Sequence, residues 1–319
     1  MLKKILLEKD NLSSLIYFKD SQNMEEIKDE QIMLILTSPP YFNLKDYSSI
    51  EAQNGQLPHS PEIYHQTYDE YLEMLTNVFR ECFRVLSKNG VFLLNIDIIR
   101  IKTDEDKNII PLPFNAITIC NEIGFGCKDI MIYKKMTGVP FQLGKKLKDR
   151  YEYLIFFTKD NNYKWNLDDV RIPYPKDYIY PEGHKRRNPI GEAPSNVWEF
   201  YPPFQSGGEH HYHYCPFPYG LVDRSIKLFT DKGDWVLDPF LGSGQVLARA
   251  KFLKRNGIGY EINEDYYKQI SNKIQKTEVG SEDEILRHVD YLEEKNEETF
   301  NKFNKKIFQK KNKKIHDYL

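Results

Sequence analysis

A glycine-rich turn between an apolar strand and a helix constrains the fold of this chain more than any other stretch. Trp235-Val236-Leu237 has the composition of a short buried strand, and it leads into Asp238-Pro239-Phe240-Leu241-Gly242-Ser243-Gly244. An apolar helical pattern follows from Val246, and residues 257–261 form a second apolar strand. Strand, helix and strand in this order make a βαβ unit, whose strands lie parallel in one sheet. The chain is therefore predicted to have an α/β fold.

The glycine turn and an acidic residue beyond it predict a ligand that carries a nucleoside. Glycines let the backbone approach a ligand closely and let the helix begin tightly against the strand. Glu261 ends the second strand about 20 residues after the glycines, where a carboxylate accepts hydrogen bonds from ribose hydroxyls. The spacing is not that of a dinucleotide fingerprint, and no Gly-Lys-Ser/Thr phosphate loop occurs. A cofactor with an adenosine but no phosphates fits best, and S-adenosylmethionine is the obvious candidate.

A second constrained stretch places two consecutive prolines directly after a strand. The apolar run 32–36 reads as a short buried strand, and Ser38-Pro39-Pro40-Tyr41 follows it. Prolines cannot donate to a sheet, so they hold a stiff turn at the carboxyl end of the strand, where open α/β sheets bind ligands. We predict that Tyr41 stacks on a flat, amino-bearing ring while the Ser38 hydroxyl and neighbouring carbonyls accept hydrogen bonds from the amine. The alternative is an ordinary proline-rich surface turn.

The rest of the chain alternates strands and helices, as a largely parallel sheet with helices on its faces requires. A helical stripe runs over 68–86, and the glycine of Lys88-Asn89-Gly90 is predicted to close that helix. Residues 43–66 lack periodicity and are predicted to be a long loop that covers the site. The other expected elements are strands at 15–18, 91–96, 129–133 and 153–157, helices at 113–122 and 219–229, a turn at 231–234, and a polar lead-in over 1–31.

Composition places the chain among ordinary soluble proteins. Its 319 residues leave room for one large domain and a smaller insert, and 40% are hydrophobic and 29% charged. No apolar run approaches the ~20 residues of a membrane span, and charged residues cut the apolar start too short for a signal peptide. Four scattered cysteines without disulfide spacing indicate a reducing compartment. We therefore expect a cytoplasmic protein without a membrane segment.

Basic residues gather in local clusters although the net charge is only −2. Such clusters on a neutral body bind phosphates, or they are simply solvated faces. Residues 159–210 are rich in Pro, Tyr, Trp, Asn, His and Arg, and they are predicted to be an irregular insert that serves as a recognition surface or as a structural excursion. The candidate phosphate contacts are Lys145, Lys146, Lys148, Arg150, Lys185, Arg186 and Arg187, and a further run of lysines lies between 305 and 314.

A cluster of possible metal ligands lies just after this insert. His210, His211, His213 and Cys215 occur within six positions of one another. Their spacing matches no closed zinc site, and no second pair of ligands accompanies them. No metal is therefore predicted.

Together the motifs resemble those of the S-adenosylmethionine-dependent amino-group DNA methyltransferases of the permuted, β-class arrangement. In that arrangement the Ser/Asp-Pro-Pro-Tyr motif comes first, the target-recognition region follows, and the cofactor motif comes last. Ser38-Pro39-Pro40-Tyr41 matches the first motif, and residues 238–244 match the last. His213 with Pro216-Phe217-Pro218 resembles an element that helps to hold the methionine part of the cofactor. Asn196-Val197-Trp198 resembles a segment near the end of the recognition region.

The resemblance implies a Rossmann-like methyltransferase fold, a mostly parallel twisted sheet with helices on both faces, plus a small irregular insert. The implied domains are a catalytic half at 1–158, a target-recognition insert at 159–210, a cofactor-binding half at 211–277 and a charged, helical or basic tail at 278–319. The catalytic residues would be Ser38, Pro39, Pro40 and Tyr41. The cofactor-binding residues would be Phe217, Asp238, Pro239, Phe240, Gly242, Ser243, Gly244 and Glu261.

Two departures from the family pattern concern the packing of the cofactor pocket. The family often has threonine after the glycine turn, where this chain has Gln245 and Val246. It often has Pro-Ala where this chain has Tyr214 and Cys215. Neither departure removes a group that the chemistry requires.

The resemblance also implies a function. The family's Ser-Pro-Pro-Tyr motif leans toward the N4 amine of cytosine and its Asp-Pro-Pro-Tyr motif toward the N6 amine of adenine, so Ser38 favours cytosine. Double-stranded DNA is the implied substrate, and a cognate restriction endonuclease acting on the same site is an implied partner. The alternatives are adenine N6 methylation, an RNA or protein-amide methyltransferase, and a cofactor-binding protein without activity.

Overall fold

The computed structural model describes the chain in several segments. These are residues 3–9, 11–40, 42, 67–100, 109–136, 149–174, 188, 190–201 and 216–281. Within these segments, no helix combines the length and the apolar character that crossing a membrane would need. The predicted loop over 43–66 and the predicted tail over 278–319 lie outside the described residues, apart from 278–281.

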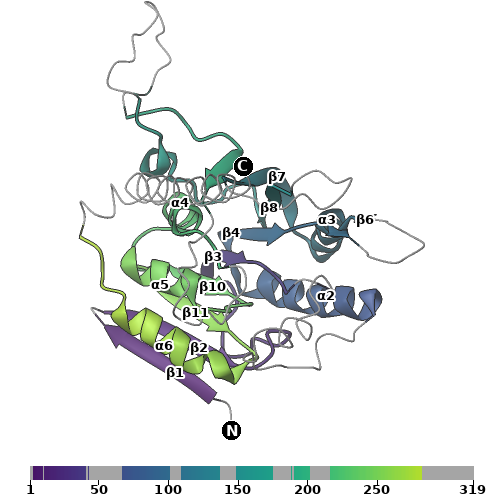
Figure 1. The fold of residues 1–319 in the computed structure, drawn as a ribbon, viewed down its shortest axis with the longest axis horizontal. Coiled ribbons are helices and arrows are strands. Elements are labelled where there is room, and N and C mark those ends of the chain that lie inside the picture. Colours follow the sequence, from purple (N-terminus) through teal and green to yellow (C-terminus); the bar gives the residue numbers. More distant parts are fainter. Residues whose placement is uncertain are drawn as a thin grey trace, which may run out of the picture.

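The described residues form one mixed sheet of nine strands and a short ribbon of β5 (Ile99–Arg100) with β6 (Ile109–Ile110) (Figure 1). The five central strands run parallel, which confirms the predicted mostly parallel sheet, while β8 is antiparallel to both of its neighbours. In spatial order the strands are β1 (Lys3–Lys9), β2 (Leu12–Phe18), β11 (Asn256–Tyr260), β10 (Trp235–Asp238), β3 (Ile32–Thr37), β4 (Leu86–Ile96), β8 (Tyr151–Thr158), β7 (Gly126–Lys135) and β9 (Val197–Phe200).

Helices cover both faces of the sheet, as predicted (Figure 1). One face carries α2 (Tyr68–Val85) and α3 (Leu112–Ile123), and the other carries α4 (Tyr219–Phe229) and α5 (Gln245–Phe252). A further helix, α6 (Tyr267–Lys276), packs against α5 and β1. Two short 3-10 helices, η2 (Leu167–Val170) and η3 (Glu264–Tyr266), complete the described elements.

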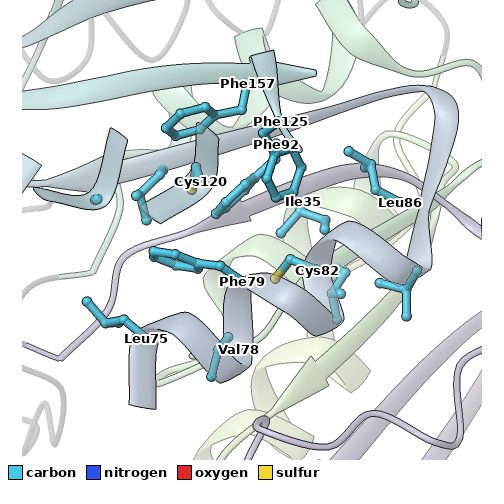
Figure 2. Close-up of a cluster of buried hydrophobic side chains, with 14 of the residues drawn as sticks. Ile35, Leu75, Val78, Phe79, Cys82, Leu86, Phe92, Cys120, Phe125 and Phe157 are labelled. Atoms are coloured by element: carbon cyan, nitrogen blue, oxygen red, sulfur yellow. The ribbon is translucent and has the colours of Figure 1, made fainter. Parts of the chain in front are cut away.

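The two faces of the sheet divide the hydrophobic core because successive strand residues point to opposite sides. In β3, Ile35 joins the cluster under α2 and α3, whereas Leu34 and Leu36 join the cluster under α4 and α5. Figure 2 shows the first cluster, in which Phe79 of α2 lies beside Phe92 of β4. Each fully buried aromatic of this kind stabilises the fold by about 1.5–3 kcal/mol, so the core is what fixes the sheet that carries the site.

Helix α2 begins as its sequence dictates but ends differently from the prediction. Thr67 and Glu70 form a reciprocal capping box at its start. The helix ends at Val85 without a glycine cap, and residues 88–90 already belong to β4, so the predicted role of Gly90 was wrong. Gly90 is needed for close packing instead, because an added Cβ would come within 3.0 Å of the Ile32 carbonyl oxygen and within 2.8 Å of Leu86 Cδ1.

Two further elements differ from the sequence-based picture. The polar lead-in contains a complete edge strand, β1, whose antiparallel pairing with β2 runs from Lys3 opposite Phe18 to Lys9 opposite Leu12. Residues of the predicted recognition insert also reach the main sheet, since β9 pairs in parallel with β7. The remaining predicted strands and helices are present, although β2, β4 and β7 begin three to five residues before the predicted starts at 15, 91 and 129.

Candidate active site

The two motifs that stand about 200 residues apart in the sequence meet at one point of the sheet. From β10 the chain passes through α5 to β11 on one side, and from β3 it passes through α2 to β4 on the other. Strands β10 and β3 are direct neighbours, with Val236 opposite Leu34 and Leu237 opposite Ile35. Their carboxyl ends therefore form a topological switch point, the place where open α/β sheets bind ligands.

A buried hydrogen bond joins the two strands at this point. Thr37 Oγ1, at the end of β3, donates to Asp238 Oδ1, at the end of β10, over 2.6 Å. The backbone N–H of Phe240 donates to the same oxygen over 3.1 Å. Burial raises the pKa of Asp238 to about 7, against the opposing effect of these two hydrogen bonds. Asp238 thus fixes the start of the glycine turn and ties it to the strand of the other motif.

The glycine turn has a backbone that only glycine adopts without strain. Gly242 has φ of 51° and Gly244 has φ of 79°, and Gly244 is also the residue that precedes α5. An added Cβ on Gly244 would lie 3.1 Å from Ile270 Cγ2, so α6 packs directly against the turn. The N–H of Leu241 donates to the carbonyl of Tyr260 over 2.8 Å, which holds the turn beside the end of β11.

Glu261 directly follows β11 and lies next to the turn. Its Oε2 accepts the N–H of Gly242 over 2.8 Å, and its Oε1 accepts the N–H of Asn263 over 2.9 Å. Burial raises the pKa of Glu261 to about 7, and the backbone donors counteract that rise. A carboxylate has about four acceptor sites, so Glu261 retains acceptor capacity for a hydroxyl. This donor and acceptor set fits the ribose of an adenosine.

Side chains from α5 and α6 support the turn. Gln245 Nε2 donates to the carbonyl of Phe217 over 3.2 Å, which links the predicted methionine-holding element to the turn. Lys273 Nζ donates to Ser243 Oγ over 3.0 Å and to Gln245 Oε1 over 3.1 Å. Burial lowers the pKa of Lys273 to about 8. Gln245, which departs from the family pattern, therefore links Phe217 to Lys273 beside the turn. Lys273 was not identified from the sequence.

The Ser-Pro-Pro turn is held by the aromatic start of α2. Tyr71 Oη donates to the carbonyl of Pro40 over 2.8 Å, and Tyr71 is 4% exposed. The ring of Phe42 packs 5.3 Å from that of Tyr71 and 5.6 Å from that of Tyr68. The sequence placed Tyr71 only in a helical stripe, since nothing in its spacing reveals a bond to a distant carbonyl.

Several predicted site residues lie outside the described residues. These are Tyr41, Lys145, Lys146, Lys148, Lys185, Arg186 and Arg187, together with the histidine cluster that ends at Cys215. Arg150 is described and exposed, and its Nη1 donates to the carbonyl of Met136 over 3.1 Å. Among the described residues, no group of three or more His, Cys, Asp or Glu side chains could hold a metal ion.

The profile of the DNA methylase family of N6/N4 methyltransferases matches residues 32–273, which is most of the chain and includes both motifs. The chain belongs to the N6/N4 DNA methylase family. It is accordingly a DNA amino-methyltransferase with S-adenosylmethionine as its cofactor, as the motifs indicated.

Relatives of this N6/N4 DNA methylase match along most of their length. The type II methyltransferase M.MthZI of Methanothermobacter thermautotrophicus is 27% identical over 301 residues, which cover 88% of this chain and 83% of that protein. The type II methyltransferase M.BglII of Bacillus subtilis is 29% identical over 257 residues, covering 79% and 66% respectively.

Solved structures share the fold. The cytosine-N4-specific PvuII DNA methyltransferase superposes with a TM-score of 0.61 at 18% identity, covering 88% of this chain and 92% of that chain. The putative DNA modification methylase TTHA0409 of Thermus thermophilus, in a structure with S-adenosyl-L-methionine, gives a TM-score of 0.54 at 24% identity, covering 82% and 96%. The Rossmann-like methyltransferase fold predicted from the motifs is confirmed.

Proposed function

We propose that this methyltransferase transfers the methyl group of S-adenosylmethionine to the N4 amine of a cytosine flipped out of double-stranded DNA. The observation that carries this proposal is the meeting of the Ser-Pro-Pro turn and the glycine turn at one switch point, joined by the bond from Thr37 to Asp238. Ser38 at the first motif position favours cytosine. The type II names of the relatives support a role in a restriction–modification system, with a cognate endonuclease as partner.

The donor and acceptor set of the site supports the cofactor-binding residues that we propose. Glu261 would accept hydrogen bonds from the ribose hydroxyls, and the turn over Gly242, Ser243 and Gly244 would let the backbone pass close to the cofactor. Asp238, Pro239 and Phe240 would hold that turn in place, and Phe217 would flank the methionine part. The cofactor supplies a methyl group on a positively charged sulfur.

The chain's own residues would make the target amine a nucleophile. The lone pair of an aromatic amine is delocalised into the ring, which makes the nitrogen a poor nucleophile. If Ser38 Oγ and the Pro39 carbonyl accept the two N–H groups, the nitrogen is drawn toward tetrahedral geometry and its lone pair turns out of the ring plane. Forming the new carbon–nitrogen bond would break the carbon–sulfur bond and leave its electron pair on a neutral thioether, and the methylated amine would release one proton to water. Positioning and charge placement would supply most of the rate enhancement.

The DNA itself would be held by stacking and by phosphate contacts. A base inside a duplex cannot reach the site, so it must flip out, and Tyr41 would stack on it with about 1–3 kcal/mol. The phosphate contacts we propose are Lys145, Lys146, Lys148, Arg150, Lys185, Arg186 and Arg187, and they would make binding sensitive to salt.

Nucleoside mass spectrometry of DNA from cells that express this chain tests the proposal. N4-methylcytosine should appear with the intact protein and be absent with Ser38→Ala. Detection of N6-methyladenine instead would leave the proposed site unchanged and make adenine the target base. Adenine is the second candidate because the same two acceptors fit either amine. If neither mark appears, competition between DNA and RNA substrates for the purified protein would show whether RNA is methylated instead.

A further inference from the structure

A row of polar side chains crosses the sheet beside Ser38. The neighbouring strands β3, β4, β8 and β7 each have an apolar residue that packs toward α4 and α5. On the same face, two positions nearer to the edge of the sheet that holds Ser38, each strand has a polar residue. Because β8 runs antiparallel to β4 and β7, its polar residue comes earlier in the chain but lies at the same edge of the sheet. The pairs of apolar and polar residues are Leu36 and Ser38, Leu93 and Asn95, Leu154 and Glu152, and Tyr133 and Lys135.

Hydrogen bonds connect this row. Asn95 Nδ2 donates to Glu152 Oε2 over 2.6 Å and lies 3.5 Å from Ser38 Oγ. A carboxylate only accepts, so its contact with Glu152 identifies the nearby amide atom of Asn95 as the nitrogen. The second N–H of the same nitrogen is then directed to Ser38. Lys135 Nζ forms an ion pair with Glu152 Oε1, which compensates the charge of the buried carboxylate.

The arrangement is costly for stability. Asn95 is 2% exposed and Glu152 is 5% exposed, so both polar side chains are buried. Asn95 Oδ1 is buried and has no hydrogen-bond partner among the described residues. A buried acceptor left without a donor loses its hydration and gains nothing in return. An apolar side chain at position 95 would continue the core of β4 without that cost, so folding alone does not account for an amide there.

We propose that Asn95, held by Glu152, is a positioning residue that fixes the Ser38 hydroxyl for methyl transfer. A serine hydroxyl otherwise rotates among three staggered positions. An N–H from Asn95 occupies one lone pair of Ser38 Oγ and leaves the other directed to the target amine. The 3.5 Å separation then shortens when the base is bound, because hydrogen bonds of active sites are often long in the free enzyme. This inference rests on the proposed role of Ser38.

A mutant cycle on the full-length protein tests the inference. Ser38→Ala, Asn95→Ala and the double variant are compared by single-turnover methyl transfer to a DNA duplex, with dissociation constants for the duplex and for S-adenosylmethionine. Asn95→Ala should slow transfer by about 10- to 100-fold, because small misplacements of a reacting group have effects of this size. Both dissociation constants should change by less than about twofold. The double variant should be no slower than Ser38→Ala.

Thr158→Val is the matched control. Thr158 is also fully buried, its Oγ1 also has no partner among the described residues, and it stands at the opposite end of β8 from Glu152. Removing this hydroxyl should leave the transfer rate within about twofold of the unaltered protein. A comparable loss in Thr158→Val would mean that any buried polar change in the sheet slows the reaction, and it would overturn the positioning role.

Other outcomes separate this inference from the proposed function. If Ser38→Ala slows transfer and Asn95→Ala does not, or if the two losses multiply in the double variant, Asn95 does not act through Ser38. If Ser38→Ala itself keeps full activity, the proposed catalytic turn fails first. Should Asn95→Ala not fold, Glu152→Gln and Glu152→Leu replace it: the glutamine keeps an acceptor for Asn95 and should retain most activity, whereas the leucine should lose it. Equal activities would overturn the inference.

Discussion

The two halves of the site are held in place by different means. The cofactor half lies mostly within one contiguous βαβ unit, where the N–H of Leu241 donates to the Tyr260 carbonyl and the N–H of Gly242 donates to the Glu261 carboxylate. Thr37 and Lys273 add side-chain bonds from outside that unit. The Ser-Pro-Pro turn depends instead on side chains from distant segments, such as Tyr71 on Pro40. The cofactor half is therefore largely a local structure, whereas the catalytic turn takes its geometry from the rest of the fold.

The largest effect should come from breaking the local geometry of the cofactor half. Gly244→Ala forces a side chain onto a left-handed backbone and brings its Cβ to 3.1 Å from Ile270. Left-handed backbone costs roughly 1–2 kcal/mol for a residue other than glycine, and the clash adds to it. The dissociation constant for S-adenosylmethionine should rise about tenfold or more, measured by isothermal titration calorimetry.

Gly233→Ala separates the two causes of that effect. Gly233 also has a left-handed backbone, with φ of 89°, but an added Cβ would meet nothing within 4 Å. Gly233→Ala should lower thermal stability, because it imposes a similar backbone strain, and it should leave cofactor binding unchanged. Equal losses of cofactor binding in both variants would show that the cofactor half is sensitive to global stability and is not a local structure.

A smaller effect concerns pH. Burial raises the pKa of Glu261 to about 7, so part of the free protein carries a neutral Glu261 below that pH. Binding of ribose hydroxyls needs the ionised acceptor, so cofactor affinity should fall as the pH is lowered from about 7.5 to about 6, by at most about tenfold per pH unit. Glu261→Gln should bind more weakly and lose this part of the dependence. Parallel pH profiles for the two proteins would contradict the role of Glu261.

The raised pKa of Glu261 also makes the free energy of unfolding depend on pH. The pKa of Glu261 is raised from 4.5, so the folded protein binds more protons than the unfolded chain between pH 4.5 and about 7. The contribution of Glu261 to the free energy of unfolding therefore decreases as pH rises through this window, in the absence of cofactor. Asp238, whose pKa is raised from 3.8 to about 7, acts in the same direction.

The smallest effect should come from the support of the catalytic turn. Tyr71→Phe keeps the ring contact with Phe42 but removes the bond to the Pro40 carbonyl, a loss of about 0.5–1.5 kcal/mol. The transfer rate should fall a few-fold with cofactor affinity unchanged. Tyr68→Phe is the control, because it removes only a bond from Asn115. A rate loss of the same size in Tyr68→Phe would show that the Pro40 bond has no special part.

The contrast between the halves also explains what the sequence could predict. The strand, glycine turn, helix, strand and Glu261 follow one another in the chain, so composition and spacing reveal them. Asn95 and Thr37 were missed although each is a polar residue at the end of an apolar strand, which is a usable signal. Gly90 was assigned to a helix end because β4 begins directly after α2, with no turn between them. The periodicity of the apolar residues does not indicate such a boundary. The bond from Tyr71 to Pro40 and the pairing of β9 depend on tertiary contacts that spacing does not encode.

The cofactor half should bind S-adenosylmethionine independently of the Ser38 hydroxyl, which only methyl transfer needs, and one variant separates the two. Ser38→Ala is measured for cofactor binding by calorimetry and for methyl transfer to duplex DNA under single-turnover conditions. We predict an unchanged dissociation constant for S-adenosylmethionine and a loss of about 100-fold or more in the rate of N4-methylcytosine formation. A variant that transfers methyl groups at the normal rate, or that no longer binds the cofactor, would contradict the account.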